Sequence, residues 1–315
     1  MTTGEGGRLD DAARAGWLYH VGGHTQDEIA RMMGVSRQSA QRLVSLAAAA
    51  GLVKIRLDHP VARCMELGRA LVDRFGLDLA EVAPSSRDAP RHLAGVAAAA
   101  AVEIERALAD EAPRIVSLGT GRTLRAAVEE VAWMERPQHR VVSRLGNLMS
   151  DGSASPFNAV VRLAERTGAR AYPMGMPVMA RTPREVALLH ALPPVASTLA
   201  LAARAEVSFV GVGGIGSDAP LAVDGFFTPA EVAALEAAGA VGEITSWAFD
   251  AAGILLDGLT NQRVVASPLR PAPDRPVVAV ALGPEKVPAI SAAVRGRLVT
   301  GLVTDEATAE AVLGP

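Results

Sequence analysis

The stretch 115-IVSLGTGRTLRAAVEEV-131 indicates the fold class of the chain. Its first four residues, Ile115–Leu118, have the length and the branched apolar character of a buried strand. A small, hydroxyl-bearing turn follows at residues 119–123, and the chain then continues with the apolar spacing of an amphipathic helix. A strand that leads at once into a helix is the building unit of α/β folds.

The same alternation continues to the end of the chain. Apolar, β-rich runs at 141–148, 207–216 and 277–282 are each followed by stretches with helical spacing, including 229–239 and 287–296. Repeated strand–helix units predict a doubly wound parallel sheet, in which ligands bind beyond the carboxyl ends of the strands. The composition is 50% hydrophobic but only 3% aromatic, which suits close-packed helices and buried strands.

Length and charge limit the functions that are possible. With 315 residues the chain can form two domains, which we expect at 1–58 and 59–315. The net charge of −3 excludes a uniformly basic nucleic-acid binder but allows a local basic patch. The single cysteine, Cys64, excludes an internal disulfide framework and a Cys-rich zinc site. No stretch has the pattern of a secretion signal or a membrane span, so we expect a soluble, cytoplasmic protein without a membrane partner.

The first sixty residues predict three short helices. Apolar residues recur with helical spacing over Leu9–Val21. Thr25 and Glu28 have the spacing of a capping box at the start of a second helix, and Ser36 is the predicted N-cap of a third, Arg37–Ala50. A helix, a short glycine-containing turn and a second helix form the helix-turn-helix motif, whose second helix enters the major groove of DNA.

The third predicted helix has one apolar and one polar side. Its apolar stripe consists of Ala40, Leu43, Val44 and Ala47. Arginine and glutamine on the other side match guanine and adenine edges, and serine suits phosphates. Residues 36–56 contain four basic residues and no acid, and residues 52–57 alternate apolar and basic side chains as a short strand or wing on the DNA backbone would. The predicted DNA-binding residues are Ser36, Arg37, Gln38, Gln41, Arg42, Ser45, Lys54 and Arg56. The alternative is an amphipathic helical hairpin with a solvated face.

Two glycine-rich turns follow predicted strands and have to be tested as nucleotide sites. Gly211, Gly213 and Gly216 satisfy the pattern GxGxxG, but residues 217–220 stand where a helix should begin on the pyrophosphate. In the opening stretch, Leu124 takes the place of the third glycine, and the P-loop pattern GxxxxGK[ST] is absent. We therefore expect no cofactor, and no spacing of ligands predicts a metal site.

The turn at 119–123 lacks a nucleotide-binding pattern but has other groups that could bind a ligand. Thr120 and Thr123 add hydroxyl donors to the backbone N–H groups and the positive end of the helix dipole, which suits a phosphate or a polyol. The alternative is an ordinary strand-to-helix turn in which Thr123 caps the helix. Asp224, Glu243 and Asp250 lie near glycines or turns and could bind sugar hydroxyls, although each by itself is better explained as a turn or capping acid than as a ligand contact.

Four segments resemble a known family in their order along the chain. After the helix-turn-helix come SLGTGRTLRAA at 117–127, GAVGEITSWAFDAAG at 239–253 and a C-terminal block at 277–313 that ends RGRLVTGLVTDEATAEAVL. Together they resemble the SorC family of sugar-responsive bacterial transcription regulators. The middle stretch, FNAVVRLAERTGARAYPMGMPV at 157–178, is similar to the branch that controls sugar-alcohol use. The resemblance implies a C-terminal sugar-binding domain related to sugar-phosphate isomerases and deaminases, without catalysis, and a homo-oligomer, either a dimer or a homotetramer.

The resemblance also implies a set of ligand-binding residues. The effector-binding residues carried over onto this chain are Gly119, Thr120, Gly121, Arg122, Thr123, Asn147, Glu243, Asp250 and Lys286. We therefore expect a transcription regulator whose binding to operator DNA responds to a sugar, a polyol or a sugar phosphate, with a helix at 61–75 linking the two domains. The main alternative is a sugar-phosphate isomerase or deaminase with a helical extension, and a third is a DNA-architectural protein, which the large α/β domain disfavours.

Overall fold

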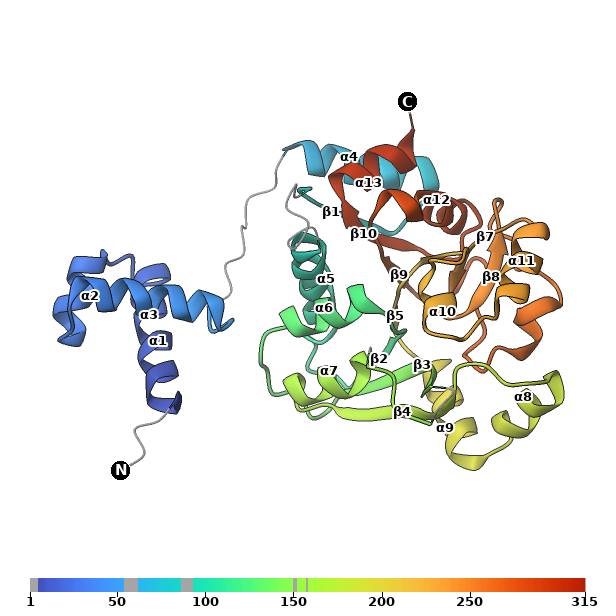
Figure 1. Cartoon of the computed structure of the whole chain (residues 1–315), viewed down its shortest axis with the longest axis horizontal. Helices are drawn as coiled ribbons and strands as arrows, with labels where there is room; N and C mark the ends of the chain where they lie inside the picture. Colours follow the sequence, from blue (N-terminus) through green and yellow to red (C-terminus); the bar gives the residue numbers. More distant parts are fainter. Residues whose placement is uncertain (1–4, 54–61, 86–92, 150–151, 157, 315) are drawn as a thin grey trace. The chain divides into compact units, whose positions relative to one another are not determined.

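The structure is a computed structural model of the chain that describes residues 5–53, 62–85, 93–149, 152–156 and 158–314. The chain divides into two compact units, an N-terminal unit, Met1–His59, and a C-terminal unit, Pro60–Pro315 (Figure 1). Among the described residues no single helix is long and apolar enough to cross a membrane. Two neighbouring helices at 183–202 pass that test only as a pair, with a bend of 87° between them.

The N-terminal unit consists of three helices, α1 (Glu5–His20), α2 (Gln26–Met33) and α3 (Arg37–Ala49). Both predicted caps are formed: Thr25 and Glu28 make a reciprocal capping box, and the Ser36 hydroxyl accepts a hydrogen bond from Ser39 N at 3.2 Å. Gly34 ends α2 with a φ of 67°, which a residue without Cβ adopts at no steric cost. The core between the helices contains Ala15, Leu18, Ile29, Ala30, Ala40 and Val44. The predicted helix-turn-helix is therefore confirmed.

The C-terminal unit is built around a parallel sheet of seven strands in the order β1-β10-β9-β5-β2-β3-β4. The strands are β1 (Leu79–Ala83), β2 (Ile115–Leu118), β3 (Arg140–Leu148), β4 (Arg170–Pro177), β5 (Val207–Val210), β9 (Val277–Val280) and β10 (Gly301–Asp305). From β2 the chain adds strands outward through β3 to β4, and it then returns to the other side of β2 with β5. The order therefore reverses between β2 and β5, which is the topological switch point of the sheet.

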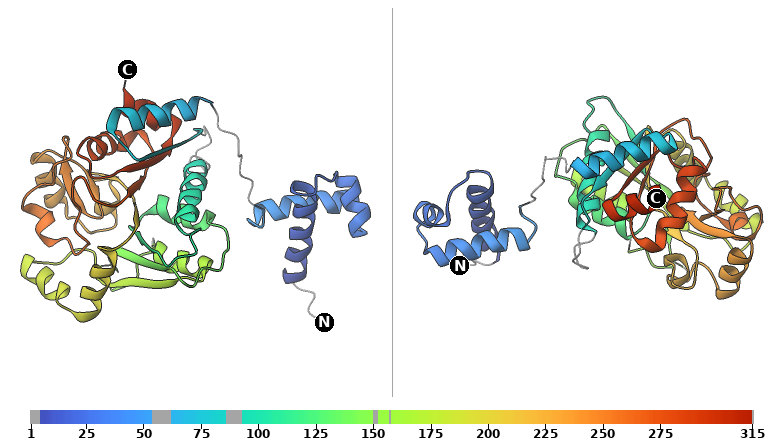
Figure 2. Two further views of the ribbon diagram at one scale, coloured as in Figure 1. Left: turned by 180° about the vertical axis from the view of Figure 1, so that it is seen from behind. Right: turned by 90° about the horizontal axis from the view of Figure 1, so that it is seen from above.

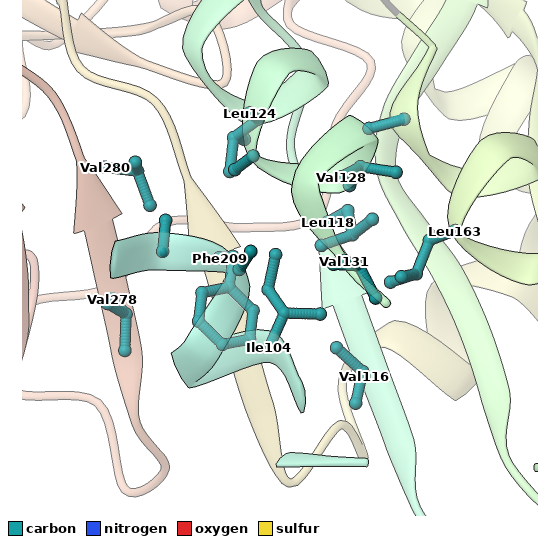
Figure 3. Close-up of a cluster of buried hydrophobic side chains, with 14 of the residues drawn as sticks. Ile104, Val116, Leu118, Leu124, Val128, Val131, Leu163, Phe209, Val278 and Val280 are labelled. Atoms are coloured by element: carbon teal, nitrogen blue, oxygen red, sulfur yellow. The ribbon is translucent and has the colours of Figure 1, made fainter. Parts of the chain in front are cut away.

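Helices cover both faces of this sheet (Figures 1 and 2). One face carries α5 (Ala94–Ala107), α6 (Arg122–Glu130) and α7 (Ala159–Thr167), and the other carries α4 (Ala62–Phe75), α9 (Pro193–Ala202), α12 (Val287–Arg295) and α13 (Glu306–Leu313). Neighbouring strand residues point to opposite faces, so Phe209 belongs to the first core, shown in Figure 3, and Val210 to the second. The predicted doubly wound α/β architecture is confirmed.

Several elements were not predicted from the sequence. After β5 the chain forms a small antiparallel sheet of β6 (Gly213–Gly214), β7 (Ala240–Ile244) and β8 (Trp247–Asp250). The glycines of the GxGxxG pattern thus lead into a strand and not into a helix. The short helices α8 (Pro183–His190) and α10 (Pro220–Val223) lie in this part of the unit, together with 3-10 turns at Leu259–Arg263 and Pro284–Lys286. Helix α11 (Pro229–Ala237), in contrast, was expected at 229–239. Leu52 and Val53 form no strand, and the rest of the predicted wing lies outside the described residues.

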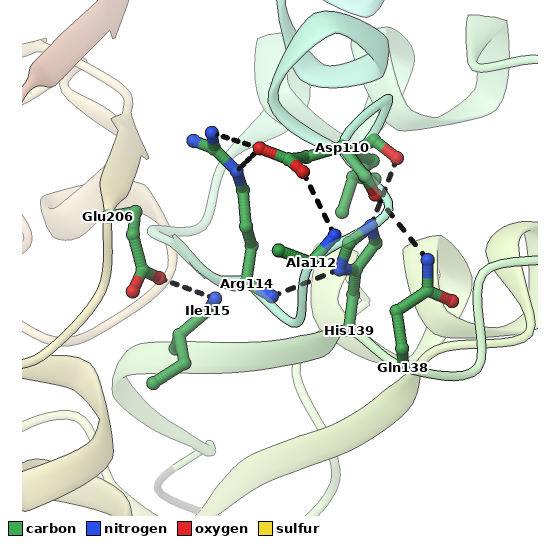
Figure 4. A network of polar contacts seen from close by, with 8 residues as sticks. Asp110, Ala112, Arg114, Ile115, Gln138, His139 and Glu206 are labelled. Carbon is green, nitrogen blue, oxygen red and sulfur yellow. Dashed lines mark hydrogen bonds and ion pairs between the residues drawn. The ribbon is translucent and has the colours of Figure 1, made fainter.

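A polar network holds the beginning of β2 (Figure 4). Arg114 N donates to His139 Nδ1 at 3.1 Å, and Ile115 N donates to the Glu206 carboxylate at 2.6 Å. The Arg114 guanidinium also pairs with Asp110, whose pKa is lowered by hydrogen bonds from Ala112 N and from this guanidinium. Because His139 and Glu206 come from segments next to β3 and β5, the network fixes where β2 starts between its two neighbours.

The helix predicted to link the two domains, α4, packs on the C-terminal unit. Its Leu67 and Leu71 are buried in the second core, and Arg63 forms an ion pair with Glu310 on α13 at 2.7 Å. Gly68 allows the helix to approach β1, because a Cβ at this position would lie 2.7 Å from Ala80 O. The helix is thus a fixed part of the sheet's second layer.

Glycines in two neighbouring strands give a stability test. A Cβ on Gly146 of β3 would collide with the carbonyl oxygens of Met176 and Pro177 in β4, whereas nothing lies within 4 Å of a Cβ on Gly175. We expect Gly146→Ala to lower the free energy of unfolding by about 1–3 kcal/mol, as overpacking does. Gly175→Ala, the control, should be neutral or slightly stabilising. Urea unfolding of the two variants measures the difference, and equal midpoints would contradict the close approach of β3 and β4.

Candidate functional site

The exposed side of α3 is the first candidate site. Ala40, Val44 and Ala47 face the core of the N-terminal unit and Leu43 is half-buried, as the predicted apolar stripe requires. The predicted DNA-contacting side chains that are exposed on the other side are Arg37, Gln38, Gln41, Arg42 and Ser45. No acidic residue lies on α3, so this face offers two cations and two amides to a partner.

Two of the predicted DNA contacts, Ser36 and Arg37, also interact within the N-terminal unit. The Ser36 hydroxyl caps α3 and also bonds to the Ser39 hydroxyl at 2.9 Å, so its main role is local. Arg37 approaches Asp27 of α2 with an Nε–Oδ1 distance of 3.4 Å, but both side chains are more than 60% exposed, and such a pair is weak enough to exchange for a phosphate. Lys54 and Arg56 lie outside the described residues.

The second candidate site is a cavity at the carboxyl ends of β2, β3 and β5, which we call the switch-point cavity. Its walls come from the turn after β2, from Gly146 in β3, from the run 211–213 after β5 and from the turn between β7 and β8. Leu145, Val178 and Phe226 supply apolar wall. Convergence of polar groups from several elements at a switch point is the usual arrangement of a ligand site in a doubly wound sheet.

Four residues of the quoted turn line this cavity: Thr120, Gly121, Arg122 and Thr123. Gly121, with a φ of 127°, is the N-cap of α6, and no side chain caps this helix end. The backbone N–H groups of the first turn of α6 and its positive dipole end therefore lie beside the cavity. Thr123 does not cap α6, so the alternative role that the sequence left open for it is not the one observed. Gly119, the fifth residue of the turn, is not part of the lining, and a Cβ at this position would lie 3.4 Å from Val210 Cα and from Thr245 Cγ2.

Glu243 and Lys286 bring charge into the switch-point cavity. Burial raises the pKa of Glu243 to about 7, although a hydrogen bond from Ser246 N at 2.7 Å and the charge of Lys286 favour its ionised form. Burial also lowers the pKa of Lys286, against the attraction of Glu285 and Glu243. Glu243 fits here because Gly213 has no side chain: a Cβ on Gly213 would overlap the Glu243 carboxylate. The two predicted residues, far apart in sequence, thus share one site.

The turn between β7 and β8 was missed by the sequence prediction. Its two residues, Thr245 and Ser246, both have positive φ, 50° and 71°, in a position where Asn-Gly is the preferred pair. Such backbone conformations cost on the order of 1–3 kcal/mol each in residues other than glycine. Both residues line the cavity, and their hydroxyl oxygens are buried and have no hydrogen-bond partner in the described structure. The strained turn therefore presents two unsatisfied hydroxyls to a ligand.

Other positions differ from the predicted set. Asp250 does not line the switch-point cavity; its Oδ1 accepts hydrogen bonds from Ala252 N and Ile254 N, each at 2.9 Å, so it acts as a turn acid. Asn147 lies beside the lining residue Gly146 but is not itself in the lining. Asp224 does line the cavity and approaches Arg122 at 3.7 Å, although only its position near a glycine indicated it in the sequence.

A pH titration tests the burial of Glu243. The folded state holds the proton of this carboxyl more tightly than the unfolded state, because its pKa rises from 4.5 to about 7 on folding. Ionisation therefore destabilises the folded protein as the pH increases from 4.5 to 7. Glu243→Gln stays neutral, so its stability relative to wild type should increase over this range by about 3 kcal/mol at most and then level off.

Urea unfolding of both proteins across this pH range measures the effect. Glu236→Gln, a change at an exposed glutamate on α11, is the control and should follow wild type at every pH. A constant stability difference between Glu243→Gln and wild type would contradict a buried, proton-binding Glu243.

The chain is similar to known regulators over almost its whole length. Residues 59–314 match the sugar-binding domain family, and residues 15–63 match the MarR family. The chain is 35% identical over 303 residues to the erythritol catabolism regulatory protein EryD of Brucella abortus (strain 2308), with 96% of each chain covered. It is 28% identical over 306 residues to the transcriptional regulator LsrR of Enterobacter sp. (strain 638), covering 96% of this chain and 92% of the relative.

Among solved structures, the full-length sorbitol operon regulator SorC from Klebsiella pneumoniae has a TM-score of 0.71 at 25% identity, covering 97% of this chain and 99% of that chain. The similarity includes the helix-turn-helix and the sugar-binding unit in the same order. The chain belongs to the SorC family of sugar-binding transcription regulators.

Proposed function

We propose that this regulator controls a carbohydrate or polyol utilisation operon, as repressor or activator, and that its affinity for operator DNA changes when a sugar, a polyol or a sugar phosphate fills the switch-point cavity. The observation that carries the proposal is the pair of buried, unpartnered hydroxyls of Thr245 and Ser246 in a cavity at the switch point of the sheet. The relatives named for erythritol catabolism and for a sorbitol operon support a sugar alcohol as the ligand class.

The chemistry of the cavity fits a compact, polyhydroxylated ligand. Glu243 and Asp224 offer acceptors for ligand hydroxyls, and Thr245 and Ser246 offer hydroxyl groups that can donate or accept. Lys286, Arg122 and the N-terminus of α6 would hold a phosphate if the ligand carries one. The apolar wall, including Phe226 and Leu145, would cover the C–H face of a sugar or polyol chain.

DNA recognition in this proposal rests on the exposed face of α3. Gln41 and Arg42 can read base edges, and Ser45 and Arg37 can contact phosphates. One helix of this size reads only a few base pairs, so specificity requires two or more copies on successive half-sites. We therefore propose a homo-oligomer, a dimer or tetramer, acting on DNA in the cytoplasm.

Coupling between ligand binding and DNA binding requires a ligand whose affinity differs between the state that can bind DNA and the state that cannot. In sequence, α4 is the first helix after the N-terminal unit, and it is anchored to α13 by the Arg63–Glu310 ion pair and to β1 by the close approach at Gly68. In the proposed mechanism, ligand binding acts on the layer of α4, α12 and α13, because Lys286 directly precedes α12.

The alternative function is that of a sugar-phosphate isomerase or deaminase. Glu243 favours it, because a carboxyl whose pKa is raised to about 7 beside a lysine is a competent general acid or base. Turnover of a sugar phosphate by the wild type that is lost in Glu243→Gln, together with no operator binding at low salt, would favour the enzyme. The capped, basic recognition helix has no role in such an enzyme.

Removing side chains from the exposed face of α3 tests DNA recognition. Arg37→Ala and Gln41→Ala should each weaken operator binding about tenfold or more, because each removes donors to a phosphate or a base edge. Ligand-induced thermal stabilisation should stay unchanged, since the switch-point cavity is intact. Gel shifts on the upstream region of the chain's own gene measure the first property. Gln262→Ala, an exposed glutamine of the C-terminal unit, is the control. Two variants that bind the operator like wild type would exclude α3 as the reading helix.

Removing hydroxyls from the quoted turn tests the ligand site. The double change Thr120→Val and Thr123→Val should abolish the thermal shift caused by the polyol, sugar or sugar phosphate that stabilises wild type most in a screen, yet leave operator binding intact. Thr304→Val is the control, because Thr304 carries a fully buried, unpartnered hydroxyl in β10, outside the cavity lining. A ligand shift that persists in the double variant would move the effector site away from this turn.

A further inference from the structure

A second cavity lies near the amino ends of β5 and β9 and beside the middle of β3. It is bounded by β3 at Arg144, by β5 at Ser208, by α9 and by the segment 267–275, and we call it the Arg144 cavity. Its volume is about 430 Å³. The switch-point cavity is lined by Val212, just after β5, and by Val280, the last residue of β9. The Arg144 cavity is lined by Ser208 and Val277, which lie near the amino ends of the same two strands. No residue lines both.

A buried arginine lies in this second cavity. Arg144 is only 7% exposed, yet among the described residues no carboxylate comes within 4.0 Å of its guanidinium. Nη1 donates to Ser208 Oγ at 3.1 Å and Nη2 donates to Pro268 O at 3.3 Å, while Nε has no partner. Burial lowers the pKa of Arg144 to about 10, which still leaves it protonated at neutral pH. A full positive charge is therefore buried without a counter-charge from the part of the chain that the structure describes.

Two serine hydroxyls beside Arg144 can donate a hydrogen bond to a ligand. Ser267 is 4% exposed, and its hydroxyl is buried in the cavity without a partner. Ser208 Oγ already accepts hydrogen bonds from Ser117 Oγ at 2.7 Å and from Arg144, so its remaining capacity is its own O–H. Arg270 and Arg275 at the exposed edge add positive charge, against one acid, Asp274. The donors and the positive charge of this cavity thus complement an anionic ligand, and α9 supplies an apolar wall.

A buried charge without a partner is costly, and the usual remedies are an ion pair or a bound ion. The backbone holds these groups in place: Ser267 N donates to Arg144 O at 2.6 Å, and Trp247 Nε1 donates to Ser267 O at 3.1 Å. We propose that the Arg144 cavity is a second ligand site, which binds a small organic anion with its carboxylate or phosphate oxygens on Arg144 Nε and on the hydroxyls of Ser208 and Ser267.

The proposal is independent of the effector in the switch-point cavity, and it gives the regulator a second input. Calorimetry on the full chain, with inorganic phosphate and with malonate as probes against chloride at equal ionic strength, tests it. We expect saturable binding of at least one probe to wild type, and the preferred probe identifies phosphate or carboxylate as the ligand group. Arg144→Met should abolish binding in the Arg144 cavity, and Ser267→Ala should weaken binding there about tenfold, as loss of a hydrogen bond to a charged group does.

Two control variants distinguish the Arg144 cavity from the switch-point cavity and from a general effect of removing positive charge. Arg140→Met, an exposed arginine on the same strand, should bind both probes like wild type. Lys286→Met in the switch-point cavity should lose only probe binding in that cavity and keep the binding that Ser267→Ala weakens. If Arg144→Met does not fold, Ser267→Ala and the two controls decide the outcome.

Three results would overturn the proposal. The first is no saturable binding to wild type up to tens of millimolar. The second is binding that is lost with Lys286→Met and kept with Ser267→Ala. The third is a wild type that binds no anion and an Arg144→Met variant that forms a smaller oligomer than wild type in sedimentation. A carboxylate of a second copy of the chain would then supply the missing negative charge.

Discussion

The pairing of β2 with β5 is the contact on which the C-terminal unit depends. These strands are far apart in sequence, and their parallel register places Ser117 beside Ser208 and Leu118 beside Phe209. Because the sheet grows in opposite directions from this pair, the turns after β2 and β5 separate and leave the switch-point cavity between them. Closer to the amino ends of the same strands, the Ser117–Ser208 hydrogen bond supports Arg144 in the second cavity.

Both cavities retain polar groups that folding alone would disfavour. The buried hydroxyls of Thr245, Ser246 and Ser267 lack partners, and the Arg144 guanidinium has no counter-charge among the described residues. Elsewhere in the sheet the buried positions are mostly Val, Leu, Ala and Phe, whose burial stabilises the fold by about 1.5–3 kcal/mol for each large side chain. The stabilisation from this apolar core offsets the free-energy cost of the strained turn at 245–246 and of the buried charge of Arg144. Four of the eight unpartnered buried polar atoms among the described residues belong to residues that line the two cavities, and such groups in a cavity are expected of a binding site.

Local features could be predicted because their causes lie within a few residues. The capping box of Thr25 and Glu28, the Ser36 cap and the left-handed Gly34 each act over one turn, so the helix-turn-helix followed from the sequence. Long-range features could not be predicted this way. The proximity of Glu243 to Lys286 was reached only through the family resemblance. Asp250, which the resemblance also implied, lies outside the cavity lining, and its carboxylate accepts hydrogen bonds from two N–H groups of its own turn.

By itself, the sequence determined the alternation of strands and helices, the capped recognition helix and the hydroxyl-rich turn after β2, because periodicity and capping are local properties of the chain. Only the tertiary structure decided which polar groups meet. Thr245 and Ser246 belong to the switch-point cavity because the β7–β8 hairpin folds back over the ends of β2 and β5. Arg144 lacks a counter-charge because the segments packed around it bring hydroxyls and carbonyls within reach of its guanidinium, and no carboxylate among the described residues. Burial and partner choice depend on contacts between distant segments, and no local pattern encodes them.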